Sequence, residues 1–502
     1  MSSTPLQNYT KQLTPPIVPG DEKRCLNRET PDLLKINCKN FAQNQLVDTS
    51  ITEAVVSRSD YCRFSLDRGR GILHSNSKIQ LGITCPTALD DGFVYQPIGG
   101  GILSQIDRAV LRSGTTVIQE VRDASHYYTQ KALLDTNEDV KNRYVITEGR
   151  TNAFETMTSI TLGAGGVVGT ATELPSQITV GNGLEPCQTY TPNPVANNNT
   201  VTQRNKLVRE VQIANNSSEF VVSLATLFPC LTQFSLPLFM TEEVIIIELF
   251  FTTSADKKIC YSGLAPAKTD VYSIDPTKTK LIADYINYSD EIMNEFREKN
   301  QTMALNFTDH QLVKSNNNYT TTANYTTSLG GSGKYVDDVL ISHSELESVD
   351  RSDSLLNNYI SNDVTDGAVA TTQMAVNLRV NDRQLFPLDV NNLSEQYQNL
   401  LLAEGMPYNL TAEEYCSGSF GQSFYPHFEF ESHALVVGLA GLKRYFGIRN
   451  SRVEERISNN GIDLIIRVTD PIALPATHVV RAYVGIRRSL VFRSGRFFVM
   501  DQ

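Results

Sequence analysis

The chain has 502 residues, of which 40% are hydrophobic and 20% charged, and its formal net charge at pH 7 is −11. This length exceeds one ordinary hydrophobic core, so two domains are expected, and the composition is that of a globular protein rather than a disordered one. The acidic balance excludes a general nucleic-acid binder, because binding phosphates requires a cationic face. We expect no secretory signal and no bilayer-spanning segment, and none of the eight cysteines forms a C-x-x-C pair.

The N-terminal half has the pattern of an all-β domain that follows an extended arm. Residues 1–45 are rich in Pro, Asn, Thr and Lys without a hydrophobic period, and we predict an N-terminal arm there. From Ile51 onward, short apolar or alternating runs are separated by Gly, Asn, Asp and Pro, which is typical of a sandwich or barrel. A short helix is expected near residues 133–143 and a long loop at about 160–205. The expected strands are 78–83, 101–106, 115–121, 220–227 and 244–252.

The stretch 281–300 predicts a strand that passes directly into a short helix. Its first half is rich in Ile, Leu and Tyr, which favour a pleated and half-buried surface. Ser289 can then cap a helix whose first turn contains Asp290 and Glu291, where negative charge suits the helix dipole. We therefore place a linker helix at 290–300, between a first domain of residues 46–289 and a second of residues 301–502.

The second region is also β-rich. Its early part, 316–333, is rich in Asn, Thr, Gly and Ser and is expected to be loop, and helices are expected at 393–404 and 412–416. Strands are expected at 375–380, 428–430, 434–439, 462–468, 479–486 and 489–499. The fold class predicted from these patterns is all-β, with two consecutive β-sandwich domains, a short joining helix and long inserted loops.

Four segments resemble motifs of the double jelly-roll major capsid proteins of large double-stranded DNA viruses, virophages and polinton-like viruses. The linker region is similar to the family's "A/V-D/N-Y-I-x-L-D-x-E-E-x-x-x-F" stretch through Ala283, Asp284, Tyr285, Ile286, Asp290, Glu291 and Phe296. The segment 235–249 resembles its "LP-(L/F)-F" motif and the aliphatic strand that follows. Residues 106–121 resemble its strand, Gly turn and strand unit. Residues 482–487 with Ser494 and Gly495 resemble its terminal strand and "L-R-x-x-S-G" tail.

The resemblance implies two eight-stranded jelly rolls standing side by side and a homotrimer that tiles an icosahedral viral shell as a pseudo-hexagon. It places the protein in the virion, after assembly in the host cytoplasm or a viral factory, and the loop at 160–205 in an outward tower. The partners it implies are further copies of the chain, minor capsid, penton or cement proteins, and an inner membrane or packaged DNA beneath the base. No small-molecule substrate is implied.

The C-terminal segment is basic against the acidic background of the chain. One interpretation is a terminal strand whose outward residues happen to be arginine. The other is a set of assembly contacts that face something anionic. These candidate contacts are Arg481, Arg487, Arg488, Arg493 and Arg496.

Several strings imitate catalytic or cofactor motifs without completing them. Residues 163–169 resemble a dinucleotide fingerprint with Val168 at the third Gly position, and 330–334 resemble a P-loop followed by Tyr335 in place of Ser or Thr. Residues 47–50 resemble an aspartic-protease loop, but no second such loop exists. The seven histidines have no metal-ligand spacing. We therefore predict no catalytic, cofactor or metal site. Two alternatives remain: a minor capsid or receptor-binding β-protein, and a β-rich hydrolase with paired carboxylates in a cleft.

Overall fold

The computed structural model describes residues 46–58, 60–84, 93–94, 101–135, 147–148, 157–162, 168–174, 178–179, 188–193, 198–204, 217–232, 234–252, 259–260, 270–271, 273–299, 302–317, 323–345, 363–364, 372–389, 448–449, 457, 460–469 and 478–501. The N-terminal arm, the helices expected at 393–404 and 412–416, and the strands expected at 428–430 and 434–439 lie outside these residues.

Two antiparallel sheets face each other in the first sandwich. One has the order β14 (Ser217–Ser223), β5 (Lys78–Thr84), β19 (Ser273–Asn287), β4 (Ile72–Leu73) and β15 (Leu236–Pro237), and β1 (Leu46–Glu53) also pairs with β19. The other has the order β2 (Val56–Arg58), β3 (Tyr61–Leu66), β16 (Ile245–Phe251), β7 (Ile106–Ser113) and β8 (Thr116–Arg122). Strict alternation in β3 buries Cys62, Phe64 and Leu66, so one face of the sheet packs into the core.

The strand order of this sandwich is that of a jelly roll. In chain order its eight main strands are β1, β3, β5, β7, β8, β14, β16 and β19. One sheet then reads first, eighth, third and sixth strand, and the other reads second, seventh, fourth and fifth. Eight strands arranged as two such nested Greek keys define the jelly-roll architecture.

The second sandwich repeats the same order. One sheet contains β20 (Thr302–Asn317), β28 (His478–Arg493), β22 (Val336–Glu345) and β26 (Ile448–Arg449). The facing sheet contains β21 (Ala323–Gly330), β27 (Ile462–Thr469), β24 (Thr372–Val380) and, paired to β24, β25 (Arg383–Gln384) and β23 (Asp363–Val364). The predicted fold class, two consecutive jelly rolls, is therefore confirmed by strand pairing.

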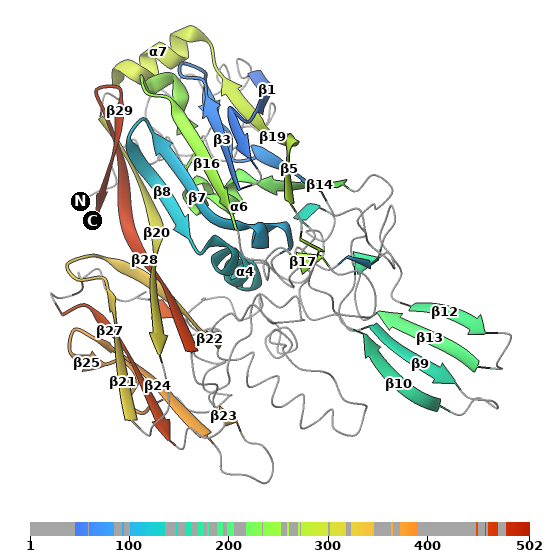
Figure 1. The fold of residues 1–502 in the computed structure, drawn as a ribbon. Coiled ribbons are helices and arrows are strands. Elements are labelled where there is room, and N and C mark those ends of the chain that lie inside the picture. Colours follow the sequence, from blue (N-terminus) through green and yellow to red (C-terminus); the bar gives the residue numbers. More distant parts are fainter. Residues whose placement is uncertain are drawn as a thin grey trace, which may run out of the picture.

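Helix α7 (Asp290–Lys299) joins the two sandwiches directly between β19 and β20, as the linker region predicts (Figure 1). The long strands β20 and β28 pair over their whole lengths and run past the first sandwich into the second. A last strand, β29 (Arg496–Asp501), turns back along the end of β28. The first and last strands of the second jelly roll therefore lie between the two cores.

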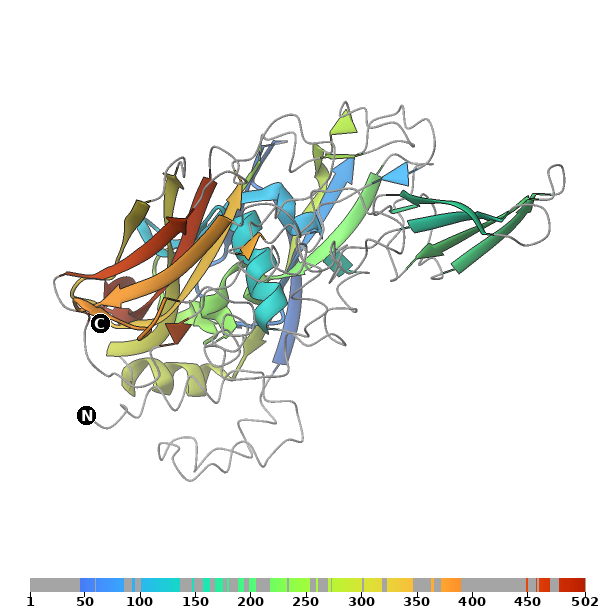
Figure 2. The same ribbon diagram turned by 90° about the horizontal axis from the view of Figure 1, so that it is seen from below.

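Some local predictions were wrong. Residues 157–204 contain a four-stranded sheet of β10 (Val168–Leu174), β9 (Met157–Leu162), β13 (Asn198–Arg204) and β12 (Gln188–Asn193), which projects from the sandwiches (Figure 2), instead of one long loop. Residues 101–105 form the 3₁₀-helix η1 (Gly101–Gln105), and the helix expected near 133–143 begins earlier, as α4 (Ala124–Asp135). Part of the loop expected at 316–333 is strand β21, because pairing with β27 overrides its weak local propensity.

The remaining elements are short. They connect the main strands or form two-stranded ribbons. They are β6 (Phe93–Val94), β11 (Ile178–Thr179), α6 (Leu224–Leu227), η2 (Pro229–Thr232), η3 (Leu238–Met240), β17 (Ile259–Cys260) and β18 (Asp270–Val271).

Candidate functional site

The surface along which the two sandwiches meet, here called the seam, is the most elaborate polar and apolar contact among the described residues. The sheet that contains β20, β28 and β22 takes part in both cores. Side chains on part of it pack into the second core: Val480, Ala482, Val484 and Ile486. Others from the same strands and β29 pack into the first core: Leu305, Phe307, Leu340, Tyr483, Leu490, Phe492 and Phe497. Separating the sandwiches would therefore expose both cores to water.

Asp123 organises the lower part of the seam. It precedes α4 with a left-handed backbone (φ 46°), a conformation that Asp adopts more readily than most residues. Its carboxylate lies 2.7 Å from Nε of Arg481 and 2.9 Å from Nδ1 of His126, with Nζ of Lys314 3.7 Å away. The hydroxyl of Tyr483 donates to its main-chain oxygen at 3.0 Å. Arg481 is only 1% exposed, so this ion pair is buried.

A second set of hydrogen bonds across the seam involves His310. Its Nε2 lies 3.0 Å from Oδ1 of Asp338 and its Nδ1 lies 3.0 Å from the hydroxyl of Tyr127 on α4. In the neutral ring, Nε2–H donates to the carboxylate and Nδ1 accepts from the tyrosine. The Asp338 carboxylate lies against Gly485 on β28, where an added Cβ would overlap Oδ1. Gly485 therefore makes room for the carboxylate that holds His310.

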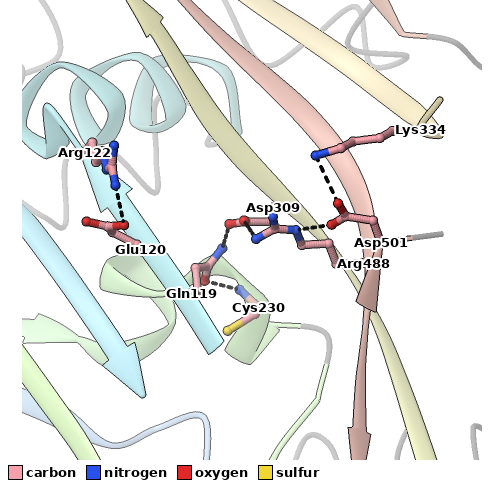
Figure 3. A network of polar contacts seen from close by, with 8 residues as sticks. All are labelled: Gln119, Glu120, Arg122, Cys230, Asp309, Lys334, Arg488 and Asp501. Carbon is pink, nitrogen blue, oxygen red and sulfur yellow. Dashed lines mark hydrogen bonds and ion pairs between the residues drawn. The ribbon is translucent and has the colours of Figure 1, made fainter. Parts of the chain in front are cut away.

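The middle of the seam is a buried chain of hydrogen bonds centred on Asp309 (Figure 3). Its carboxylate accepts from Nε2 of Gln119 at 3.2 Å and from Nη1 of Arg488 at 2.6 Å. Gln119 in turn accepts from the main-chain N–H of Cys230 at 3.0 Å. Burial raises the pKa of Asp309 above its ordinary value although Arg488 opposes the shift. This chain joins strands of both sandwiches through groups that are otherwise cut off from water.

The same network reaches the surface through Arg488. Its Nε lies 2.8 Å from Asp501, whose other carboxylate oxygen lies 3.0 Å from Nζ of Lys334. Burial alone would raise the pKa of Asp501, but the bonds and charges of Lys334 and Arg488 lower it below its ordinary value. On the opposite face of β8, Glu120 pairs with Arg122 at 3.0 Å and takes no part in the chain (Figure 3). The C-terminal strand is thus tied to β28 by charge as well as by pairing.

The upper part of the seam is formed by the β28–β29 turn and helix α7. The N–H of Glu242 donates to the carbonyl of Gly495 at 2.9 Å, and Gly495 has φ 77°, which favours glycine. On α7, Nη2 of Arg297 donates to the carbonyl of Phe239 at 2.6 Å, and the rings of Phe239 and Phe296 meet edge to face at 5.8 Å. The segment around 239–242 therefore receives both the linker helix and the C-terminal turn.

All four segments that carry the family resemblance contribute to this seam. They are the linker region, the segment 235–249, the strand unit 106–121 and the terminal strand with Ser494 and Gly495. Their contacts join residues far apart in the chain, such as Thr241 and Gly495, which are 254 positions apart. Sequence patterns identified the segments, but no local signal indicated that they meet.

The five candidate arginines have different surroundings. Arg481 and Arg488 are bound to carboxylates inside the chain, and Arg487 pairs with Asp337. Arg493 is exposed, and Arg496 is 65% exposed with its Nε 3.6 Å from Glu243. A contact with another molecule stays a prediction. Arg493 and Arg496 belong to the exposed residues, and the Arg487 side chain, although paired with Asp337, is 42% exposed.

The strings that imitate catalytic motifs have ordinary structural roles where they are described. Residues 47–50 lie in β1, paired with β19, and Gly330, Gly331 and Gly333 form a turn in which all three have positive φ. Within the described part of the chain, no three His, Cys, Asp or Glu side chains are arranged to hold a metal ion. No helix of the described residues is long and apolar enough to cross a membrane.

Comparison with known proteins gives similarity at the level of structure only. No family model matches the chain, and no curated protein matches its sequence. The Faustovirus major capsid protein is 8% identical with a TM-score of 0.49, covering 89% of this chain and 90% of that one. The Sputnik virophage structure is 12% identical with a TM-score of 0.49, covering 91% of this chain and 88% of that one.

PBCV-1 VP54, fitted into a reconstruction of Sputnik, is 11% identical with a TM-score of 0.48, covering 91% of this chain and 97% of that one. These are structural proteins of virus particles, not enzymes. At such identities the similarity concerns the fold alone. The jelly-roll assignment itself depends on the strand orders of the four main sheets.

Proposed function

We propose that this chain is a major capsid protein that assembles as pseudo-hexagonal homotrimers into an icosahedral viral shell. Its location is then the virion, and its assembly takes place in the host cytoplasm or a viral factory. Its partners are other copies of itself, minor capsid, penton or cement proteins, and a membrane or packaged DNA beneath the base. The function is mechanical and resides in interfaces rather than in a catalytic site.

The observation that supports this proposal best is the seam between two jelly rolls of the same strand order. One chain supplies two similar wedges, and their shared sheet and buried ion pairs fix the angle between them. Three such rigid pairs around a three-fold axis give six wedges, which is a closed arrangement. Two loosely linked sandwiches could not define such a tile, because their relative orientation would vary from copy to copy.

The projecting sheet of β9, β10, β12 and β13 supports a second candidate function (Figure 2). A sheet that extends from the body of a virion protein is suited to contact a cell or a glycan. A minor capsid or receptor-binding protein would use it without forming a lattice. In the major capsid protein the same sheet would form the outward tower of each trimer.

The native mass of the purified chain, with electron micrographs of the same sample, tests the proposal. Three copies of the 55.8-kDa chain have a mass of about 167 kDa. We expect this mass and a pseudo-hexagonal outline. A stable monomer that binds glycans or cells would contradict the proposal and favour the receptor-binding function.

A further inference from the structure

An exposed apolar and basic patch lies at the C-terminal hairpin that β28 and β29 form. Phe498 and Met500 are 46% and 57% exposed, although both are large and apolar. Arg493 and Arg496 are exposed beside them, and Val244 is a further exposed apolar residue nearby. We call these five residues the hairpin patch. Exposed apolar surface rimmed by charge marks a place where a protein binds another molecule.

The hairpin patch is one continuous face. Alternation along β29 directs residues 496, 498 and 500 outward, whereas Phe497 between them is fully buried in the first core. Arg493 pairs with Arg496 across the hairpin, so their side chains leave the sheet on the same side. Val244 directly follows Glu243, whose carboxylate lies 3.6 Å from Nε of Arg496. Strand register thus places Arg493, Arg496, Phe498 and Met500 on one face, and the Arg496–Glu243 pair brings the chain at Val244 beside them.

A complementary surface lies at the same end of the molecule, on helix α7 (Figure 1). Asp290, Glu291 and Glu298 are exposed on this helix. Helix α7 and the β28–β29 turn both contact the segment around 239–242, through the bonds from Arg297 to Phe239 and from Glu242 to Gly495. An acidic helix face and a basic apolar hairpin are therefore neighbours on one chain.

We propose that the hairpin patch binds the acidic face of α7 in a second copy of this chain, in a two-fold contact between neighbouring trimers. A two-fold axis at this end brings the patch of each copy against the helix of the other, so both pairs form at once. Two arginines then meet three carboxylates, and Phe498 and Met500, residue types that interface cores favour, become buried. This inference rests on the proposed function and names the surface that joins one tile to the next.

Charge reversal in the full-length chain tests the contact. One variant carries Arg493→Glu and Arg496→Glu, a second carries Glu291→Lys and Glu298→Lys, and a third carries all four substitutions. We expect the first two to reduce the yield of shells at least about tenfold with trimer mass unchanged, and the third to restore it, because opposite charges again meet. The control is Lys78→Glu with Arg383→Glu, which reverses two exposed cations elsewhere and should not change the yield.

The outcomes distinguish a contact with a second copy of the chain from binding to a lipid layer. Normal shells from the first variant, or failure of the third to restore them, would overturn the contact with a second copy. Normal shells from the first variant, together with loss of its binding to anionic phospholipid vesicles, would assign the patch to a lipid layer instead. A wild-type chain that forms neither trimers nor shells contradicts the proposed function, and with it this contact. Wild-type trimers and shells with reversals that have no effect contradict the contact alone.

Discussion

The buried ion pair between Arg481 and Asp123 gives a direct measure of how strongly the seam holds the two sandwiches together. Arg481→Met removes the guanidinium while keeping an apolar stem of similar length. Asp123 then stays nearly buried, with His126 and Lys314 as the remaining neighbours of its carboxylate. Removing one partner of a buried pair costs about 3–5 kcal/mol, since the other charge is left uncompensated. Because these neighbours remain, we expect a cost at the lower end of this range, about 3 kcal/mol.

The free energy of unfolding of dissociated chains can be measured by urea titration. Tyrosine fluorescence and circular dichroism are suitable probes because the chain contains no tryptophan. The matched control is Arg467→Met, which removes an equally short ion pair, 2.6 Å to Asp389, but one whose arginine is 45% exposed. We expect the control to cost at most about 1 kcal/mol.

A double-mutant cycle completes this test. Asp123→Asn tolerates the left-handed backbone and removes the charge, so Arg481→Met should cost about 2 kcal/mol less in that background. If Arg481→Met costs no more than Arg467→Met, or if the two seam substitutions are additive, the ion pair does not hold the seam. The apolar contacts of the shared sheet would then be sufficient.

Two further predictions follow from single sites. Gly485→Ala should lower the free energy of unfolding by about 1–3 kcal/mol, because the new Cβ would overlap the carboxylate of Asp338. The same substitution should cost much less in an Asp338→Ala background, and an equal cost in both backgrounds would contradict the steric reason. Stability should also fall as the pH decreases from 7 to below 4. Burial lowers the pKa of His74 below its ordinary value. The contribution of the neutral His74 to stability is therefore fully present above about pH 6.5 and is lost as the pH falls through its pKa in the folded state. Burial would raise the pKa of Glu248, but hydrogen bonding to Arg112 lowers it below its ordinary value. Glu248 therefore contributes to the free energy of unfolding at pH values above the ordinary pKa of glutamate. This contribution is lost as the pH falls through the lower pKa of the folded state. Urea titrations across this range should therefore show that the free energy of unfolding decreases less steeply with falling pH in Glu248→Gln than in the wild type. An unchanged dependence on pH would contradict the role given to Glu248.

The sequence predicted the fold class because sandwich strands carry local signals. The apolar run of β16 indicates a strand that faces a core, and Ser289 with Asp290 marks where β19 passes into α7. Predictions failed where strand pairing in the tertiary structure overrides a weak local sequence preference. The Asn- and Thr-rich β21 is a strand because β27 supplies its hydrogen bonds. The residues 101–105 resemble a strand in composition but form η1.

The candidate site was only partly accessible from sequence. A basic C-terminal segment was visible, but its arginines were grouped by their order in the chain. Their surroundings differ because carboxylates from distant segments reach some of them, Asp123 for Arg481 and Asp309 for Arg488. The requirement for glycine at 485 was equally hidden, since it depends on the side chain of Asp338, which is brought there by strand pairing.

The sequence by itself determined that this chain folds as two β-rich domains joined by a short helix, because hydrophobic period, turn residues and helix caps act over a few neighbouring positions. The tertiary structure alone decided that the two jelly rolls share a sheet and are locked by buried ion pairs. It also decided that an acidic helix and a basic hairpin lie at one end. Such contacts join residues hundreds of positions apart, and their energies depend on burial and distance, which only the folded chain defines.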